Sequence, residues 1–232
     1  MKVFHHVIGL IASFALILIL LITSFEIGIY SDFEWYQKEY EKYEVLTDLE
    51  MEMEDVMDVT NEMMAYLRGN REDLVVRTMV DGVEREFFND REKAHMADVQ
   101  NLFLGGLDLR LYTAVGFVGT IVILVFSKAD WKRVVPKCFI LGLAGFLILM
   151  AIFAMLCISD FTKYFTIFHE IFFDNDLWIL DPRTDLLIRM LPEGFFADMV
   201  VRIGSIFAGF LVVFLSGSVY FFKKTKLKKI KN

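Results

Sequence analysis

The sequence predicts a mostly α-helical membrane protein, a polytopic four-helix bundle that carries a small extracytoplasmic α+β cap. Three observations predict this class. Of the 232 residues, 56% are hydrophobic, which exceeds the roughly 45–50% that is usual for a soluble domain. Four long runs contain no charged residue, and acidic and basic residues are segregated along the chain. The chain is therefore neither disordered nor an ordinary soluble domain.

The four uncharged runs are long enough to cross a bilayer as helices. They are Val7–Phe25, Leu111–Ser127, Cys138–Ser159 and Ile203–Phe222. About 20 apolar residues in a helix cross the hydrocarbon core, where open backbone has no partner. We expect transmembrane helices at 1–30, 108–127, 138–159 and 203–222. The first run has no good cleavage site, so we interpret it as a retained anchor rather than a signal peptide.

Charge predicts the orientation. The loop at 128–137 has four basic residues and one acid, and the tail at 223–232 has six lysines and no acid. The positive-inside rule then predicts that this loop and both termini are cytoplasmic. Segments 31–107 and 160–202 would lie outside, and the first of them has a net charge of −12. With the whole chain at −7, a nucleic-acid partner is not expected, whereas membrane lipid is.

The first outside segment shows a helix and a hairpin. Apolar residues recur at three- and four-residue steps over 46–67, which predicts one amphipathic helix closed by Gly69. Two short β-prone runs then flank Asp81-Gly82, a pair typical of a two-residue hairpin turn. These elements form the first part of the predicted cap.

A second cap helix is predicted to carry a histidine. Asn89 stands three residues before Glu92, a spacing that resembles a capping box. The helix that starts there would carry His95. We expect Gly105-Gly106 to loosen its junction with the second span.

Two of the four histidines are candidates for catalysis. His5 and His6 lie at the cytoplasmic end of the first span, where an interfacial role is expected. His95 precedes the second span and His169 follows the third, so both are predicted to lie outside. A bundle that joins these spans could bring both rings to one site, and histidine transfers protons near neutral pH. The alternative is two unrelated, solvated histidines.

Each candidate histidine has a carboxylate nearby in the sequence. Asp98 follows His95 by three residues, which places both on one face of a helix. Asp174 follows His169 by five residues and meets it only if the helix has ended. The second spacing also matches the H-x4-D pattern of glycerolipid acyltransferases.

Several other chemistries lack their motifs. The sequence has no G-x-S-x-G elbow, no H-E-x-x-H and no phosphate-binding glycine loop. Its two cysteines, Cys138 and Cys157, lie too far apart on one predicted helix to form a disulfide. We predict no metal site, although a zinc-dependent membrane hydrolase using His95, His169 and a carboxylate stays an alternative.

Two motifs resemble a known family. The first is FNDREKAHMADV at 88–99. The second runs from FHEIFF at 168–173 through WILDPRTD at 178–185. Both are similar to the lipoprotein intramolecular transacylases of Gram-positive bacteria. Tyr66-Leu67-Arg68-Gly69 and the four-span layout agree with this resemblance.

The resemblance implies an activity and a location. The substrate would be a diacylated bacterial lipoprotein, whose sn-2 acyl chain moves from glycerol to the α-amino group of the same N-terminal cysteine. The product would be an N-acyl, S-monoacylglyceryl (lyso) lipoprotein. No cofactor is implied, because an ester becomes an amide. The enzyme would lie in the bacterial plasma membrane with its active site at the extracytoplasmic face.

We expect the two histidines to act as the catalytic acid–base pair, without assigning which is the acid. The expected supporting residues are Asp98 and Asp174 as orienting groups, and Asn89, Arg91, Tyr66 and Trp178 as oxyanion or substrate contacts. A different class of function also fits the sequence: a non-enzymatic membrane sensor or interaction protein with an acidic cap.

Overall fold

The computed structural model describes the backbone of residues 1–231 and the side chains through Lys224, so most side chains of the predicted basic tail lie outside the described residues. The chain divides into two compact units. Unit 1 comprises Met1–Ile27, Leu107–Ser159 and the chain from Ile203 onward, and unit 2 comprises Gly28–Gly106 and Asp160–Arg202.

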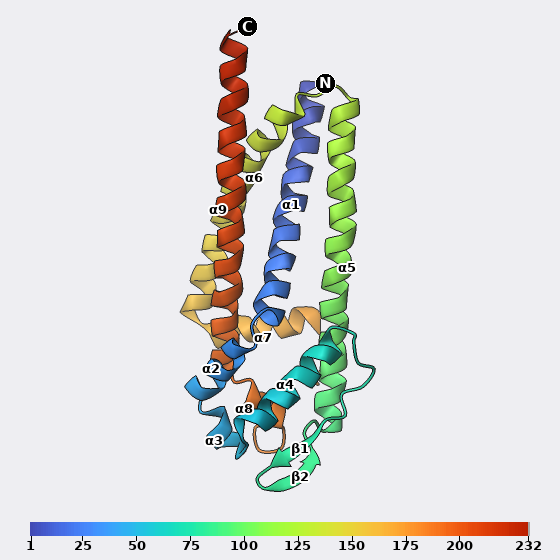
Figure 1. Ribbon diagram of the computed structural model, residues 1–232, viewed down its shortest axis with the longest axis vertical. Helices are drawn as coiled ribbons and strands as arrows, with labels where there is room; N and C mark the ends of the chain where they lie inside the picture. Colours follow the sequence, from blue (N-terminus) through green and yellow to red (C-terminus); the bar gives the residue numbers. More distant parts are fainter. Residues whose placement is uncertain (232) are drawn as a thin grey trace. The chain divides into compact units, whose positions relative to one another are not determined.

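The fold is mostly helical, with a single small sheet in the described chain (Figure 1). The elements are α1 (Lys2–Tyr30), α2 (Glu34–Lys42), α3 (Val45–Leu49), α4 (Met53–Leu67), β1 (Arg77–Val80), β2 (Val83–Glu86), α5 (Asp90–Phe126), α6 (Trp131–Ser159), α7 (Phe161–Phe172), α8 (Leu186–Met190) and α9 (Glu193–Lys231). Four of them, α1, α5, α6 and α9, are long and apolar enough to cross a membrane. The predicted fold class is confirmed.

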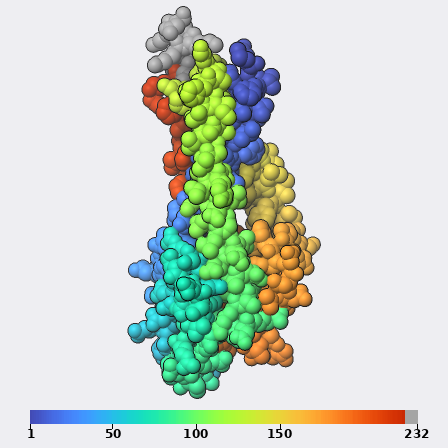
Figure 2. Space-filling model, turned by 90° about the vertical axis from the view of Figure 1, so that its right-hand side faces the viewer, coloured from blue at the N-terminus to red at the C-terminus, as the bar shows by residue number. Residues whose placement is uncertain are grey.

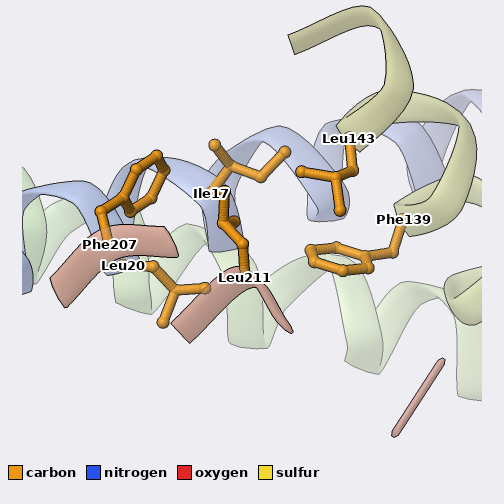
Figure 3. Packing of buried hydrophobic residues seen from close by; sticks show 6 residues of the cluster. All are labelled: Ile17, Leu20, Phe139, Leu143, Phe207 and Leu211. Atoms are coloured by element: carbon orange, nitrogen blue, oxygen red, sulfur yellow. The ribbon is translucent and has the colours of Figure 1, made fainter. Parts of the chain in front are cut away.

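Unit 1 is held together by side chains from three of these helices. Its buried cluster contains Ile17 and Leu20 of α1, Phe139 and Leu143 of α6, and Phe207 and Leu211 of α9 (Figure 3). The helices α1 and α6 also approach closely at Gly9, where an added Cβ would lie 2.8 Å from the Sγ of Cys138. Cys138 and Cys157 are both free thiols.

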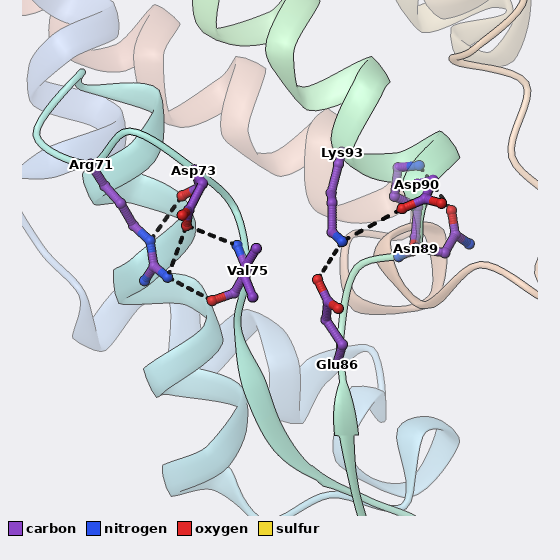
Figure 4. Close-up of polar contacts among 8 residues, drawn as sticks. Arg71, Asp73, Val75, Glu86, Asn89, Asp90 and Lys93 are labelled. Carbon is purple, nitrogen blue, oxygen red and sulfur yellow. Dashed lines mark hydrogen bonds and ion pairs between the residues drawn. The ribbon is translucent and has the colours of Figure 1, made fainter.

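The predicted hairpin is confirmed in unit 2. Strands β1 and β2 pair antiparallel from Arg77↔Glu86 to Val80↔Val83. Asp81 and Gly82 form the turn with φ of 52° and 67°, the left-handed conformation that a type I′ turn requires. Glu86 then forms an ion pair with Lys93 on α5, which also faces Asp90 (Figure 4).

The single helix predicted over 46–67 is wrong in its continuity. It is divided into α3 and α4 at Glu50, whose φ of 54° ends the first helix. Leu49 and Met51 are both buried on either side of this turn, so packing outweighs helical periodicity here. The closure at Gly69 is confirmed, with φ of 76° and the amide of Asn70 donating to the carbonyl of Ala65.

The expected loosening at Gly105-Gly106 is also wrong, because α5 continues through both residues to Phe126. Glycine in a helix interior costs only about 1 kcal/mol relative to alanine. Breaking the helix beside an apolar span would leave several backbone groups without partners. One helix therefore contributes to both units, with its first turns in unit 2.

Candidate active site

The first turn of α5 positions His95. The backbone amide of Asn89 donates to Glu92 Oε2 at 2.7 Å, and the amide of Glu92 donates to Asn89 Oδ1 at 3.0 Å. This reciprocal pair is the predicted capping box. Because the cap fixes the start of the helix, it also fixes the direction of the His95 side chain one turn later.

Helix α7 positions His169 in its last turn. The helix starts at Asp160, whose carboxylate accepts a hydrogen bond from the amide of Lys163 at 3.0 Å. His169 Nδ1 lies 2.8 Å from the carbonyl oxygen of Phe165. A carbonyl only accepts hydrogen bonds, so Nδ1 carries the proton and Nε2 of the neutral ring keeps a lone pair.

The structure brings the two candidate histidines together within unit 2. Their ring centres are 6.1 Å apart at an interplanar angle of 36°. Both residues are buried, since only 7% of His95 and 8% of His169 is exposed. Phe173 packs against both rings, at 5.3 Å and 5.6 Å between centres. In Figure 2, the segment that carries His169 (orange) lies beside the first turns of α5 (green).

Aromatic side chains surround His169. Trp178 stacks on it at 5.0 Å with an interplanar angle of 29°, and Phe165 contacts it edge-on at 4.4 Å. Phe168 contacts it from a third direction at 5.4 Å. These rings exclude water and leave few polar partners for a charged imidazole.

This burial keeps both rings neutral near neutral pH. Desolvation, followed by the proximity of His169, lowers the pKa of His95 to about 4, against a raising effect of Asp98. His95 and Asp98 both precede Leu111, where the uncharged part of α5 begins. Desolvation also lowers the pKa of His169, although its hydrogen bond to Phe165 raises it. A neutral imidazole can accept a proton with one nitrogen and donate from the other.

The carboxylates predicted to orient the histidines have other surroundings. Asp98 Oδ2 accepts a hydrogen bond from Asn175 Nδ2 at 2.9 Å, and no hydrogen bond from Asp98 or Asp174 to a histidine occurs among the described residues. Both carboxylates instead line a cavity of about 370 Å³. The cavity is lined by Asp98, Asn101, Leu102, Phe172, Phe173, Asp174 and Asn175. Phe173 is shared between this cavity and the histidine pair.

Three other predicted contacts are made to the protein itself. Arg91 donates to the backbone carbonyl of Asp176. Asn89 Nδ2 donates to Asp185 Oδ1 at 2.8 Å. The buried Tyr66 accepts, through its carbonyl, a hydrogen bond of 2.5 Å from Gln100 Nε2, and burial raises the pKa of its phenol.

Sequence reasoning missed the roles of Glu92 and Asp185 in joining the two motifs. Glu92 is 1% exposed, and its Oε1 accepts the amide of Leu187 at 2.6 Å while Oε2 accepts that of Asn89. Asp185, 4% exposed, accepts from Asn89 and from the amide of Asp181 at 2.7 Å. Burial raises the pKa of Glu92, while its backbone hydrogen bonds lower it. The sequence signals were an acid at the third position of α5 and an Asp directly before α8.

No group of three or more His, Cys, Asp and Glu side chains is arranged to hold a metal ion in the part of the chain whose side chains are described. The candidate site consists of the histidine pair and its aromatic walls.

Four membrane-length helices and a buried pair of neutral histidines define a multi-pass membrane protein with a site suited to proton transfer. The model of the family "lipoprotein intramolecular transacylase Lit" matches residues 10–196. The chain therefore belongs to this family, and it is an enzyme that transfers an acyl group within a lipoprotein.

Solved structures agree with this fold. The chain is similar to the membrane-integral lipoprotein intramolecular transacylase Lit from Bacillus cereus, with a TM-score of 0.76, 21% identity and coverage of 98% of this chain and 100% of that one. A variant of the same protein in which one histidine is replaced by arginine matches with a TM-score of 0.72, 19% identity and coverage of 98% and 96%. A histidine-to-alanine variant matches with the same score and identity over 97% of each chain. No curated protein matches the chain.

Proposed function

We propose that this enzyme moves the sn-2 acyl chain of a diacylglyceryl-cysteine lipoprotein onto the α-amino group of the same cysteine. The product is an N-acyl, S-monoacylglyceryl lipoprotein. The observation that carries the proposal is the buried pair His95 and His169, with ring centres 6.1 Å apart. Two such rings are within reach of one substrate carbonyl, and the family provides the lipoprotein substrate.

The reaction needs one proton to be moved between two substrate atoms. The neutral amine attacks the ester carbonyl, forming the N–C bond, and loses a proton to a base. The tetrahedral intermediate then breaks the C–O bond, and the departing glyceryl oxygen takes a proton. The proton balance closes without a cofactor, and positioned acid–base groups accelerate such steps by about 10²–10⁴-fold.

We assign His169 as the base. Its Nδ1 proton is committed to the carbonyl of Phe165, which leaves the Nε2 lone pair to accept the amine proton and later return it to the glyceryl oxygen. Desolvation is the main cause that lowers the pKa of His95, to about 4. As a neutral ring it serves as the hydrogen-bond donor to the oxyanion, which needs no protonated imidazole.

The acidic cavity beside the pair suits the substrate amine. Asp98 and Asp174 line it together with the apolar Phe172 and Phe173. A negative lining attracts the ammonium form of the substrate cysteine, which loses one proton to water before the neutral amine attacks. Because amine and ester belong to one molecule, holding them in contact lowers the barrier by up to about 7–11 kcal/mol.

Charge along the chain supports an outward-facing site. The basic loop at 128–137 and the lysines after the fourth span favour a cytoplasmic location for both termini. Unit 2, which contains both histidines, then lies at the extracytoplasmic face of the plasma membrane, where lipoproteins carry their lipid.

The test is expression of the chain in a bacterium that lacks the activity, followed by mass spectrometry of lipoprotein N-termini. We expect lyso-lipoprotein with the unaltered chain. His95→Ala and His169→Ala should each reduce its formation by about 10²-fold or more at equal expression. Full activity in both variants would refute the roles of the histidines.

The same assay separates the other classes of function. A sensor or interaction protein would yield no lyso-lipoprotein and would respond to substitutions on the exposed acidic face of α4. A zinc hydrolase would lose activity on treatment with a chelator and regain it with zinc, whereas the proposed transacylase is unaffected by chelation.

A further inference from the structure

Helix α7 exposes an apolar face. Ile171 is 68% exposed, Phe172 51% and Phe168 41%. The rings of Phe168 and Phe172 pack against each other at 4.8 Å between centres, and they are the exposed aromatic rings of unit 2. Three large apolar side chains on one short helix form a patch that water does not favour.

Beside this face, α7 is held by the protein, and opposite it α7 is polar. Thr162 Oγ1 donates to Glu193 Oε1 at 2.6 Å, and the ring of Phe165 packs on that of Phe196 at 5.0 Å. Glu170, on the opposite side from Phe168, is exposed. This separation of a charged side from an apolar side is typical of a helix that lies in a membrane interface.

The chain itself identifies what covers the apolar face. Asp160 alone separates the end of α6 at Ser159 from the start of α7 at Phe161. Helix α6 is a candidate membrane span, so α7 begins at the membrane surface where that span ends. The acyl chains of the leaflet around the end of α6 are therefore the apolar phase nearest to α7.

We propose that α7 is embedded in the membrane interface, with Phe168, Ile171 and Phe172 inserted among lipid acyl chains. His169 follows Phe168 and is therefore about 100° around the helix from it. The ring, buried within unit 2, thus lies at the edge of the inserted face, at the depth where the acyl chains meet the headgroups.

This depth matches the proposed reaction. The ester carbonyls of a membrane-resident glycerolipid also lie between the acyl chains and water. Insertion of α7 would therefore present His169 to the scissile ester without lifting the lipid out of the bilayer. This last step rests on the proposed function, whereas the insertion itself does not.

Spin labels on the full-length enzyme in phosphatidylglycerol–phosphatidylethanolamine vesicles test the insertion. Cys138 and Cys157 are first replaced by alanine, and single labels are placed at Ile171→Cys, Glu170→Cys and Val83→Cys. Val83 is the matched control, because it is 61% exposed on the hairpin. We expect the Ile171 label to collide preferentially with oxygen, and the Glu170 and Val83 labels to collide preferentially with a water-soluble nickel complex. An Ile171 label as accessible to nickel as the Val83 label overturns the proposal.

Activity tests the link to catalysis. Ile171→Glu should slow transacylation in vesicles, since it charges the inserted face, while Val83→Glu should leave the rate unchanged. If the Ile171 label lies in lipid but Ile171→Glu retains the full rate, the role of insertion in catalysis is refuted. If the label lies in lipid and His169→Ala is fully active, the insertion stands and the proposed catalytic function fails.

Discussion

The two units bury polar side chains in different ways. In unit 1, the buried Ser13 and Ser24 donate to carbonyls of their own helix, Gly9 and Leu20, each at 2.7 Å. In unit 2, buried carboxylates accept hydrogen bonds from distant parts of the chain, as Glu92 does from the amide of Leu187. Long helices satisfy their own backbone, so their side chains need only fill space.

The irregular segments of unit 2 need side-chain partners instead. Turns and short helices leave backbone amides without an intrahelical acceptor, and a buried carboxylate supplies one. A unit built on such buried polar contacts can also hold two desolvated histidines in a fixed geometry. The histidine pair therefore lies in the unit whose irregular segments are fixed by buried polar contacts.

The largest expected effect on stability is in unit 1. Phe139→Ala removes a ring that is 2% exposed within the three-helix cluster, which should lower the free energy of unfolding by about 3–5 kcal/mol. The specific activity of the folded fraction should not change, since Phe139 lies outside unit 2. Thermal unfolding in detergent and turnover per folded molecule measure the two quantities. A loss of turnover at full folding would contradict the separation between the units.

The next effect is in unit 2 and should affect both quantities. Glu92→Ala leaves the amides of Asn89 and Leu187 without their acceptor, which should cost about 2–3 kcal/mol of stability and reduce turnover by displacing His95. Glu92→Gln is the matched control, because its carbonyl oxygen replaces one of the two acceptors. Unaltered unfolding and turnover in Glu92→Ala would show that the carboxylate does not hold the site.

Acid should weaken unit 2 through its histidines. Because the pKa of His95 is lowered from 6.5 to about 4, the unfolded chain binds more protons between these values. Stability is therefore fully present above pH 6.5 and falls as the pH drops toward 4. Thermal unfolding at pH 7 and pH 5 measures the difference, which should be smaller in His95→Gln. An equal pH dependence in this variant would assign the effect to other groups.

The smallest effect is expected at the exposed turn before α8. Arg183 pairs with Asp181, but its side chain is 86% exposed, and exposed ion pairs contribute little. Arg183→Ala should leave both the melting temperature and turnover unchanged within error. A clear loss of turnover would indicate that Arg183 contacts the substrate, although its charge does not stabilise the fold.

Several elements were predictable because their signals are local. The uncharged runs predicted membrane helices, Asp81-Gly82 predicted the hairpin turn, and Asn89 with Glu92 predicted the cap of α5. Helix α2 was not predicted, although its buried Tyr36 and Tyr40 are essential to its packing. Local patterns also failed at Glu50, where tertiary packing interrupts a good amphipathic period.

Local sequence alone specifies the number of membrane helices and the two histidine motifs, since both depend on residues that are neighbours in the chain. Three contacts arise only in the folded chain: the rings of His95 and His169 lie close together, Asn175 pairs with Asp98, and Trp178 stacks on His169. These contacts join α5 to residues that follow α6. Their free energy comes from burial and hydrogen bonds between distant segments, and no periodicity within one segment encodes it.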